Sequence, residues 1–144
     1  MYGPRTIFLY FVVALAIGCT SSLIKHQPVM AANAAETFGK LAFVERNYGS
    51  ALNFVKGGNS SDDVRTMVER LHPTGSYPVN VVAVSYEPMP GKESMKIYLE
   101  GSGTEPSYHY LAVMEGTESK EYKVSAIARS EDPFPGSNSI KPIR

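Results

Sequence analysis

The chain contains a single cysteine and no excess of charge of either sign. One cysteine cannot form an intramolecular disulfide, and it excludes cysteine-rich zinc and iron–sulfur sites. The 14 Lys and Arg residues are balanced by 14 Asp and Glu residues, whereas nucleic-acid binding requires an excess of basic residues on one face. No two of the three histidines, His26, His72 and His109, have a spacing typical of metal ligands. A chain of 144 residues is long enough for one domain with its own core.

The amino-terminal residues differ in composition from the rest of the chain. Arg5 is the only charged residue before Lys25, and residues 7–18 form an unbroken apolar run. A basic start followed by a short apolar core is typical of a secretory signal peptide, which we place at residues 1–18. As a helix, the run spans about 18 Å, less than the ~30 Å hydrocarbon core of a bilayer. Extension of the run to Ile24 gives a marginal membrane span, so an uncleaved anchor is the alternative.

The apolar run ends in Ala16-Ile17-Gly18-Cys19, which resembles the lipobox of bacterial lipoproteins. Gly18 and Cys19 fit the pattern, whereas Ala16 and Ile17 differ from the family's usual residues. The resemblance implies that Cys19 is acylated and becomes the first mature residue. Two or more acyl chains hold a protein stably on a bilayer. We therefore expect residues 19–30 to contain the lipid attachment site and a polar tether, and the protein to be anchored to the membrane through lipid on Cys19.

The first half of the mature chain has helical periodicity. Apolar residues recur at helical spacing over residues 31–56, with an interruption near Asn47 and Gly49, which predicts one broken helix or two short helices. Ser60 and Asp63 have capping-box spacing and predict the start of a further helix, which ends at Pro73. His72 is then interpreted as a cation favoured by the dipole at the helix end.

After Pro78 the period of the apolar pattern changes to two. Four alternating segments, at about residues 79–86, 95–100, 108–114 and 122–129, are separated by short turns rich in glycine and proline. Because such short connections leave little room for crossover helices, we expect four strands in an antiparallel meander. The remainder, residues 132–144, contains three prolines and is predicted to be an extended or disordered tail.

Helices followed by antiparallel strands define an α+β fold. This order of elements resembles the NTF2-like (cystatin-like) superfamily, as do the tyrosine-rich segment SYHYLAVMEG and the following EYKVSAI. The resemblance covers residues 31–131. It implies amino-terminal helices packed on a curved four-stranded antiparallel sheet that forms a cone. It does not imply one activity, because the superfamily includes enzymes, binding modules and scaffold domains.

The strands carry the candidate residues for a pocket or a binding face. Alternation places Tyr108 and Tyr110 on one face of the sheet, and Leu111 and Val113 on the other. The alternative interpretation is amphipathic packing, in which each tyrosine hydroxyl reaches water. The candidates are Tyr98, Tyr108, His109, Tyr110 and Tyr122.

No residue pattern indicates catalysis. Enzymes of the superfamily use an acid or base inside the cone, but here Asp62 and Asp63 are explained by helix capping. The glutamates fall mainly at turns, and Glu100, beside Leu99, is the best remaining carboxylate candidate. The sequence has no glycine-rich phosphate loop and no Gly-x-Ser-x-Gly motif. We therefore expect no enzymatic activity, no metal and no cofactor.

Together these patterns predict an exported, lipid-anchored protein of the cell envelope, facing the periplasm or the exterior. We expect it to bind a protein partner or envelope component, not nucleic acid, through the outer sheet face and the turns at 101–106 and 115–120. One alternative is a scaffold subunit of a secretion or conjugation machine with an uncleaved membrane helix. Others are a small-ligand-binding protein or enzyme that uses the cone, and an inhibitor or immunity factor.

Overall fold

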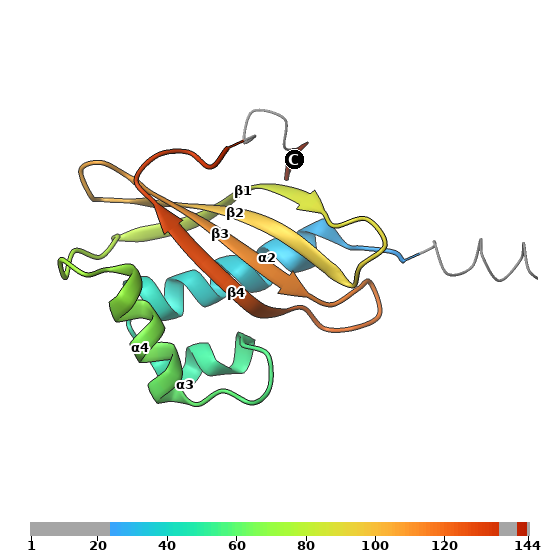
Figure 1. Cartoon of the computed structure of the whole chain (residues 1–144), viewed down its shortest axis with the longest axis horizontal. Coiled ribbons are helices and arrows are strands. Elements are labelled where there is room, and N and C mark those ends of the chain that lie inside the picture. Colours follow the sequence, from blue (N-terminus) through green and yellow to red (C-terminus); the bar gives the residue numbers. More distant parts are fainter. Residues whose placement is uncertain (1–23, 136–140, 144) are drawn as a thin grey trace, which may run out of the picture.

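The computed structural model describes residues 24–135 and 141–143. The predicted signal peptide and Cys19 lie outside the described residues. The fold is α+β, as predicted, and its helices lie on one side of an antiparallel sheet (Figure 1). The α-helices are α2 (Pro28–Gly39), α3 (Tyr48–Ala51) and α4 (Ser61–Leu71), and the strands are β1 (Asn80–Pro88), β2 (Ser94–Ser102), β3 (Tyr108–Glu115), β4 (Lys123–Ser130) and β5 (Lys141–Pro142).

Helix α2 begins at Pro28, earlier than the predicted start at Ala31. Proline is favoured at the first helical position because its missing N–H has no helical partner there. The side chain of Gln27 caps this end by accepting a hydrogen bond from the Val29 N–H at 3.3 Å. Part of the segment that we predicted to be a tether is therefore helical.

The predicted interruption of the helical segment near Asn47 is confirmed. Helix α2 continues as a π-helical turn over Lys40–Val44, and Arg46, with φ at 52°, ends it. The Asn47 side chain then accepts the Ser50 N–H at 3.2 Å and so begins α3. A 3₁₀ turn over Leu52–Phe54 follows α3.

The predicted capping box at the start of α4 is also confirmed. The Ser60 N–H donates to Asp63 Oδ2 at 2.8 Å, and the Asp63 N–H donates to Ser60 Oγ at 3.2 Å. These reciprocal bonds satisfy two backbone donors that would otherwise lack partners. Helix α4 buries Val64 and Val68.

Among residues 24–135 and 141–143, the sheet has five strands in the order β4-β3-β2-β1-β5, and β1 to β4 form the predicted antiparallel meander. The four-stranded prediction is corrected by β5, which pairs Lys141 with Tyr86 and Pro142 with Ser85. Phe134 also packs on Tyr98, with ring centroids 6.3 Å apart. Two parts of the predicted tail are therefore ordered against the sheet. They were missed because tail contacts with distant residues leave no periodic pattern.

Helix α2 packs closely on the inner face of the sheet. Small residues on the helix, Ala31, Ala35 and Gly39, are buried in this contact. A Cβ atom placed on Gly39 would lie 2.8 Å from Cγ1 of Val81 in β1, closer than carbon atoms approach one another. Glycine at this position therefore lets the helix and the strand approach each other.

We predict that Gly39→Ala lowers the free energy of unfolding by about 1–3 kcal/mol, because the added methyl overpacks the contact with Val81. Gly49→Ala is the matched control, since Gly49 is exposed in α3 and its Cβ would meet nothing closer than 4.0 Å. There the higher helix propensity of alanine stabilises by about 0.5–1 kcal/mol. Urea unfolding measures both values. Equal effects of the two substitutions would contradict the close packing.

Candidate functional site

The five candidate residues do not form one site. The register of β2 and β3 places Tyr98 and His109 on the face of the sheet that α2 does not cover. Tyr108 and Tyr110 point to the opposite, helix-covered face and are buried in the core. Tyr122 precedes β4 and is buried at one end of the sheet. The candidate residues therefore lie in three separate environments, and not on the single face that we considered.

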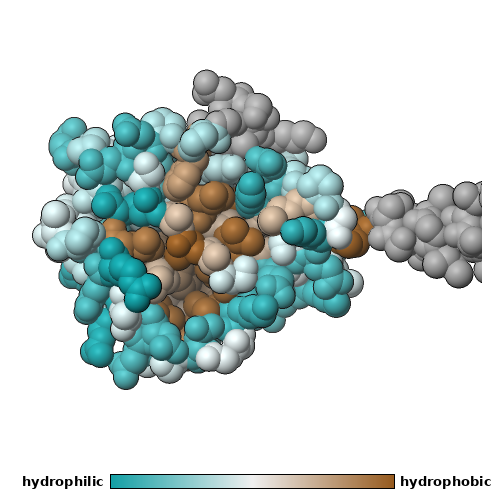
Figure 2. Space-filling model, viewed as in Figure 1, coloured by the Kyte–Doolittle hydropathy of each residue, from teal (hydrophilic) through white to brown (hydrophobic). Residues whose placement is uncertain are grey.

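We call the face of the sheet that no helix within residues 24–135 covers the helix-free face. It carries an apolar strip, which we define as Leu111, Val113, Ala126 and Ala128. In the antiparallel pairing of β3 with β4, Leu111 lies opposite Ala128 and Val113 opposite Ala126. All four side chains are partly or fully exposed. The sheet lies in front of α2 in Figure 1, and Figure 2 shows apolar residues gathered in the middle of this face. The short alanine side chains leave Leu111 and Val113 uncovered on the β4 side.

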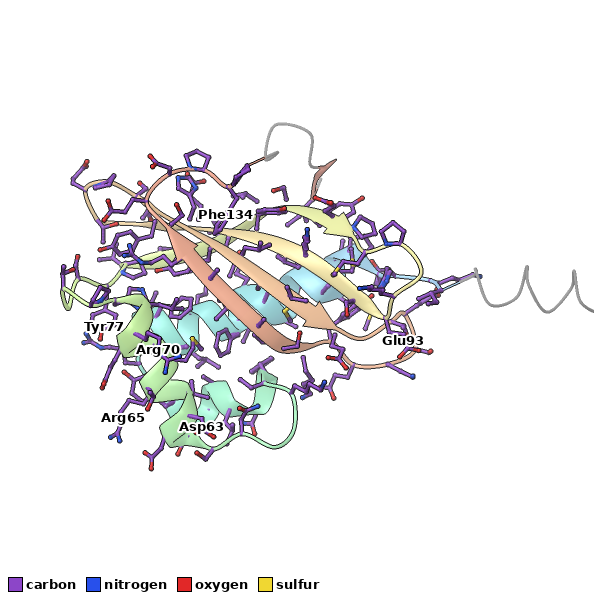
Figure 3. The ribbon with its side chains drawn as sticks, in the orientation of Figure 1. Asp63, Arg65, Arg70, Tyr77, Glu93 and Phe134 are labelled. Carbon is purple, nitrogen blue, oxygen red and sulfur yellow. The ribbon has the colours of Figure 1, made fainter. Side chains whose placement is uncertain are left out.

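The strip is bordered by the tail residue Phe134, which packs on Tyr98, and by the polar residues His109 and Glu100. Tyr98 lies opposite Leu111 in the register, and Phe134 of the tail packs on its ring (labelled in Figure 3). The Tyr98 hydroxyl donates to Glu87 Oε2 at 3.4 Å, and burial, with the Glu87 carboxylate, raises the pKa of Tyr98. His109 lies opposite Glu100 on β2 and is half-buried. The strip therefore has an apolar centre and polar margins.

On the inner face, His72 forms a buried hydrogen-bond network that sequence analysis missed. Its side chain is 2% exposed. Nδ1 lies 2.7 Å from the Val68 carbonyl oxygen, and Nε2 lies 2.8 Å from the Tyr110 hydroxyl. Because a carbonyl only accepts, Nδ1 carries the proton and Nε2 accepts from Tyr110. Both ring nitrogens of His72 are therefore hydrogen-bonded while the ring is neutral.

The prediction that His72 is a cation at the helix end is therefore wrong. Burial lowers the pKa of His72, and the nearby charge of Arg129 lowers it further, against the effect of the Val68 hydrogen bond. Desolvation of the charged ring outweighs the helix dipole here. The sequence suggested exposure because His72 directly precedes Pro73 at the end of α4.

Aromatic rings and one arginine enclose His72. Phe43 stacks on Tyr110, with centroids 4.5 Å apart and planes at 15°. The guanidinium of Arg129 lies 3.9 Å from the centre of the Tyr108 ring, and its Nε–H donates to the Leu71 carbonyl. Burial raises the pKa of Tyr110. This cluster joins α4 to β3 and β4, so its polar groups serve the fold.

A third polar contact, the entry clasp, lies where the chain enters the domain. We define the entry clasp as the bonds among His26, Gln27, Lys92 and Tyr122. The Tyr122 hydroxyl accepts the Gln27 N–H at 3.0 Å and lies 2.9 Å from His26 Nδ1. His26 Nε2 lies 2.9 Å from the Lys92 carbonyl oxygen, so Nε2 carries the proton and Nδ1 accepts from Tyr122. No local pattern joins residues so far apart in the sequence.

A groove of about 630 Å³ separates α2 from β1 at the edge of the sheet. Val29, Val82 and Val84 line it, and each of these side chains is exposed. Glu36 also lines it, but the Glu36 carboxylate accepts the Ala83 N–H at 2.9 Å. The one carboxylate in this groove is therefore engaged by the backbone.

Within the described ranges, no three His, Cys, Asp or Glu side chains are grouped closely enough to bind a metal ion. Every helix in residues 24–135 is too short or too polar to cross a membrane. No family model, no curated protein and no solved structure matches the chain. The arrangement of its own residues is therefore the basis for assigning a function.

We predict that stability falls with acidification because of His72. Folding lowers the pKa of His72 from its ordinary value near 6.5, so the unfolded chain binds more protons than the folded chain below about pH 6.5. The stabilising contribution is present above that pH and is lost as the pH falls below it.

Urea unfolding between about pH 7.5 and pH 5 measures this loss. His72→Phe removes the titrating ring, so stability of this variant should depend less steeply on pH. His109→Gln is the control for the loss of a histidine, because His109 lies on the other face of the sheet and does not contact His72. An unchanged slope in His72→Phe would contradict the neutral, buried His72.

Proposed function

We propose that the protein is an exported, lipid-anchored, non-enzymatic protein of the cell envelope that binds a protein partner through the apolar strip of an NTF2-like domain. The observation that carries this proposal is the strip itself. It lies on the face of the sheet that α2 leaves uncovered, and the tail residue Phe134 packs beside it on Tyr98. An apolar centre with a polar margin is the anatomy of a protein–protein interface.

The contacts of the ionisable side chains favour binding over catalysis. The ring nitrogens of His72 are both hydrogen-bonded inside the core. The carboxylate of Glu36 accepts a backbone N–H, and Glu100 lies half-exposed on the helix-free face. General acid–base catalysis requires a group that is free to exchange a proton with a substrate.

The order of elements supports the NTF2-like assignment. Helices come first, and α2 lies against the inner face of a twisted antiparallel meander (Figure 1). Helices packed on an antiparallel sheet are one part of what the superfamily resemblance implies for residues 31–131, and this part supports the proposal. The ordered tail extends the same sheet by one short strand.

We predict that Cys19→Ser releases the protein from membranes while its domain still folds. The reason is that two or more acyl chains on Cys19 supply the membrane affinity. Fractionation of cells, with circular dichroism of the released protein, measures both properties. Retention of the variant in the membrane fraction would instead favour an uncleaved helical anchor.

We predict that a photo-crosslinking amino acid placed at Ala128, in the strip, forms one discrete adduct in the cells that make the protein. The same amino acid at Thr66, which is exposed on α4, serves as the control and should form none. Val113→Lys puts a charge into the strip and should abolish the Ala128 adduct without unfolding the domain. Equal adducts from both positions, or an adduct that survives Val113→Lys, would argue against binding through the strip.

A further inference from the structure

We infer that the domain stands end-on on the membrane, with its entry end against the lipid headgroups. The entry end consists of residues 24–27, the β1–β2 turn at 89–93 and the β3–β4 connection at 116–122. This inference rests on the proposed acylation of Cys19. It goes beyond the proposed function in two respects. It names the bilayer surface as a second contact of the domain, and it gives the direction in which the apolar strip faces.

The entry clasp fixes the beginning of the described chain to this end of the domain. His26 and Gln27 are bonded to Tyr122 and to Lys92, as described above. One residue earlier, the Lys25 carbonyl accepts the Glu118 N–H at 2.9 Å. Figure 1 shows the chain entering where the two connections lie, and Glu93 marks this end in Figure 3.

The two connections are also bonded to each other. The Gly116 N–H donates to the Glu93 carbonyl at 2.9 Å, and Lys120 Nζ lies 2.9 Å from both carboxylate oxygens of Glu93. The attachment point of the tether is therefore hydrogen-bonded to one connection, which is in turn bonded to the other. A tether that starts at this end keeps this end of the domain, and not the far end, near the membrane.

The distance that the tether can bridge is shorter than the sequence suggested. We expected the tether to run through Met30, but the chain is bonded to the domain from Lys25 onward, first through the Lys25 carbonyl and then through the entry clasp. The six residues from Thr20 to Lys25 reach at most about 20 Å when fully extended. Strand β2, with nine residues, spans about 26 Å between the two ends of the sheet. The entry end therefore lies within reach of the bilayer, and the β2–β3 turn lies at the far end.

The chemistry of the entry end suits a headgroup layer. It is polar, and its three lysines are balanced in number by three glutamates, so the surface has little net charge. Such a surface rests on headgroups without adsorbing strongly by itself, and the acyl chains supply the affinity. We therefore expect high salt to leave the protein on the membrane. These charged residues are Lys25, Lys92, Lys120, Glu93, Glu118 and Glu121.

An end-on orientation has a consequence for the partner. The strands run from the entry end to the far end, so the helix-free face stands roughly perpendicular to the membrane plane. The apolar strip then faces sideways. A partner that is itself attached to the same membrane reaches the strip without lifting the domain.

The test measures how fast single cysteines react with a bulky, membrane-impermeant maleimide on the full chain in native membranes. Ser119→Cys places a thiol at the entry end, and Ser107→Cys places one at the far end; both serines are exposed. Ala128→Cys reports on the helix-free face. We expect position 119 to react at least several-fold more slowly than positions 107 and 128. After solubilisation in detergent, the three rates should become similar.

Further arms separate the possible failures. The parent chain has only Cys19, so its labelling would overturn the acylation of Cys19 and not the geometry. An unlabelled parent with equal rates at 119 and 107 would overturn the end-on orientation alone. Slow labelling at 128 would instead show a domain that lies face down. A flexible Gly/Ser insertion after Ser22 should raise the rate at 119 and keep the protein on the membrane, and an unchanged rate would also contradict the inference.

Discussion

The close approach of α2 to β1 is the constraint on which the rest of the structure depends. Ala31, Ala35 and Gly39 give the helix a flat, small-residue surface, so the helix backbone lies near the sheet and larger side chains of the sheet fill the space beside it. Phe38 and Phe43 then pack edge to face, with centroids 5.8 Å apart. Because α2 occupies the inner face, the opposite face remains free of helices and carries the apolar strip.

The second layer of helices is joined to the sheet by a polar contact inside an apolar surrounding. His72 at the end of α4 is bonded to Tyr110 of β3, and Arg129 of β4 is bonded to the end of the same helix. Buried polar groups are costly when unpaired, so these bonds define one position of α4 on the sheet. His72 makes these bonds in its neutral form, so the packing of α4 on the sheet depends on the protonation state of this ring.

Three tyrosines stabilise three different parts of the molecule. Tyr110 supports the core through His72, Tyr98 borders the strip beneath Phe134, and Tyr122 holds the entering chain through its hydroxyl. In the proposed function the last two positions are coupled. In our proposal, the clasp sets how the domain stands on the membrane, and this orientation decides which neighbours can reach the strip.

Much of the fold could be predicted from local patterns. The capping box at Ser60 and Asp63, the break near Asn47 and the alternation of β3 each depend on residues a few positions apart, and each is confirmed. The start of α2 was misplaced, because its cap at Gln27 is not among the residues usually found there. The alternation that separates Tyr108 and Tyr110 from Leu111 and Val113 is confirmed, but the sequence did not predict which of the two faces the helices cover.

By itself, the sequence determined the order of helices and strands, the antiparallel meander and the residues that alternate across β3. The burial of His72 in its neutral form, the addition of β5 by the tail and the bonds of Tyr122 to His26 and Gln27 became apparent only in the folded structure. The physical reason is range. Helix capping and strand alternation are set by neighbours along the chain, whereas burial and long-range hydrogen bonds depend on which distant segments meet when the sheet closes over α2.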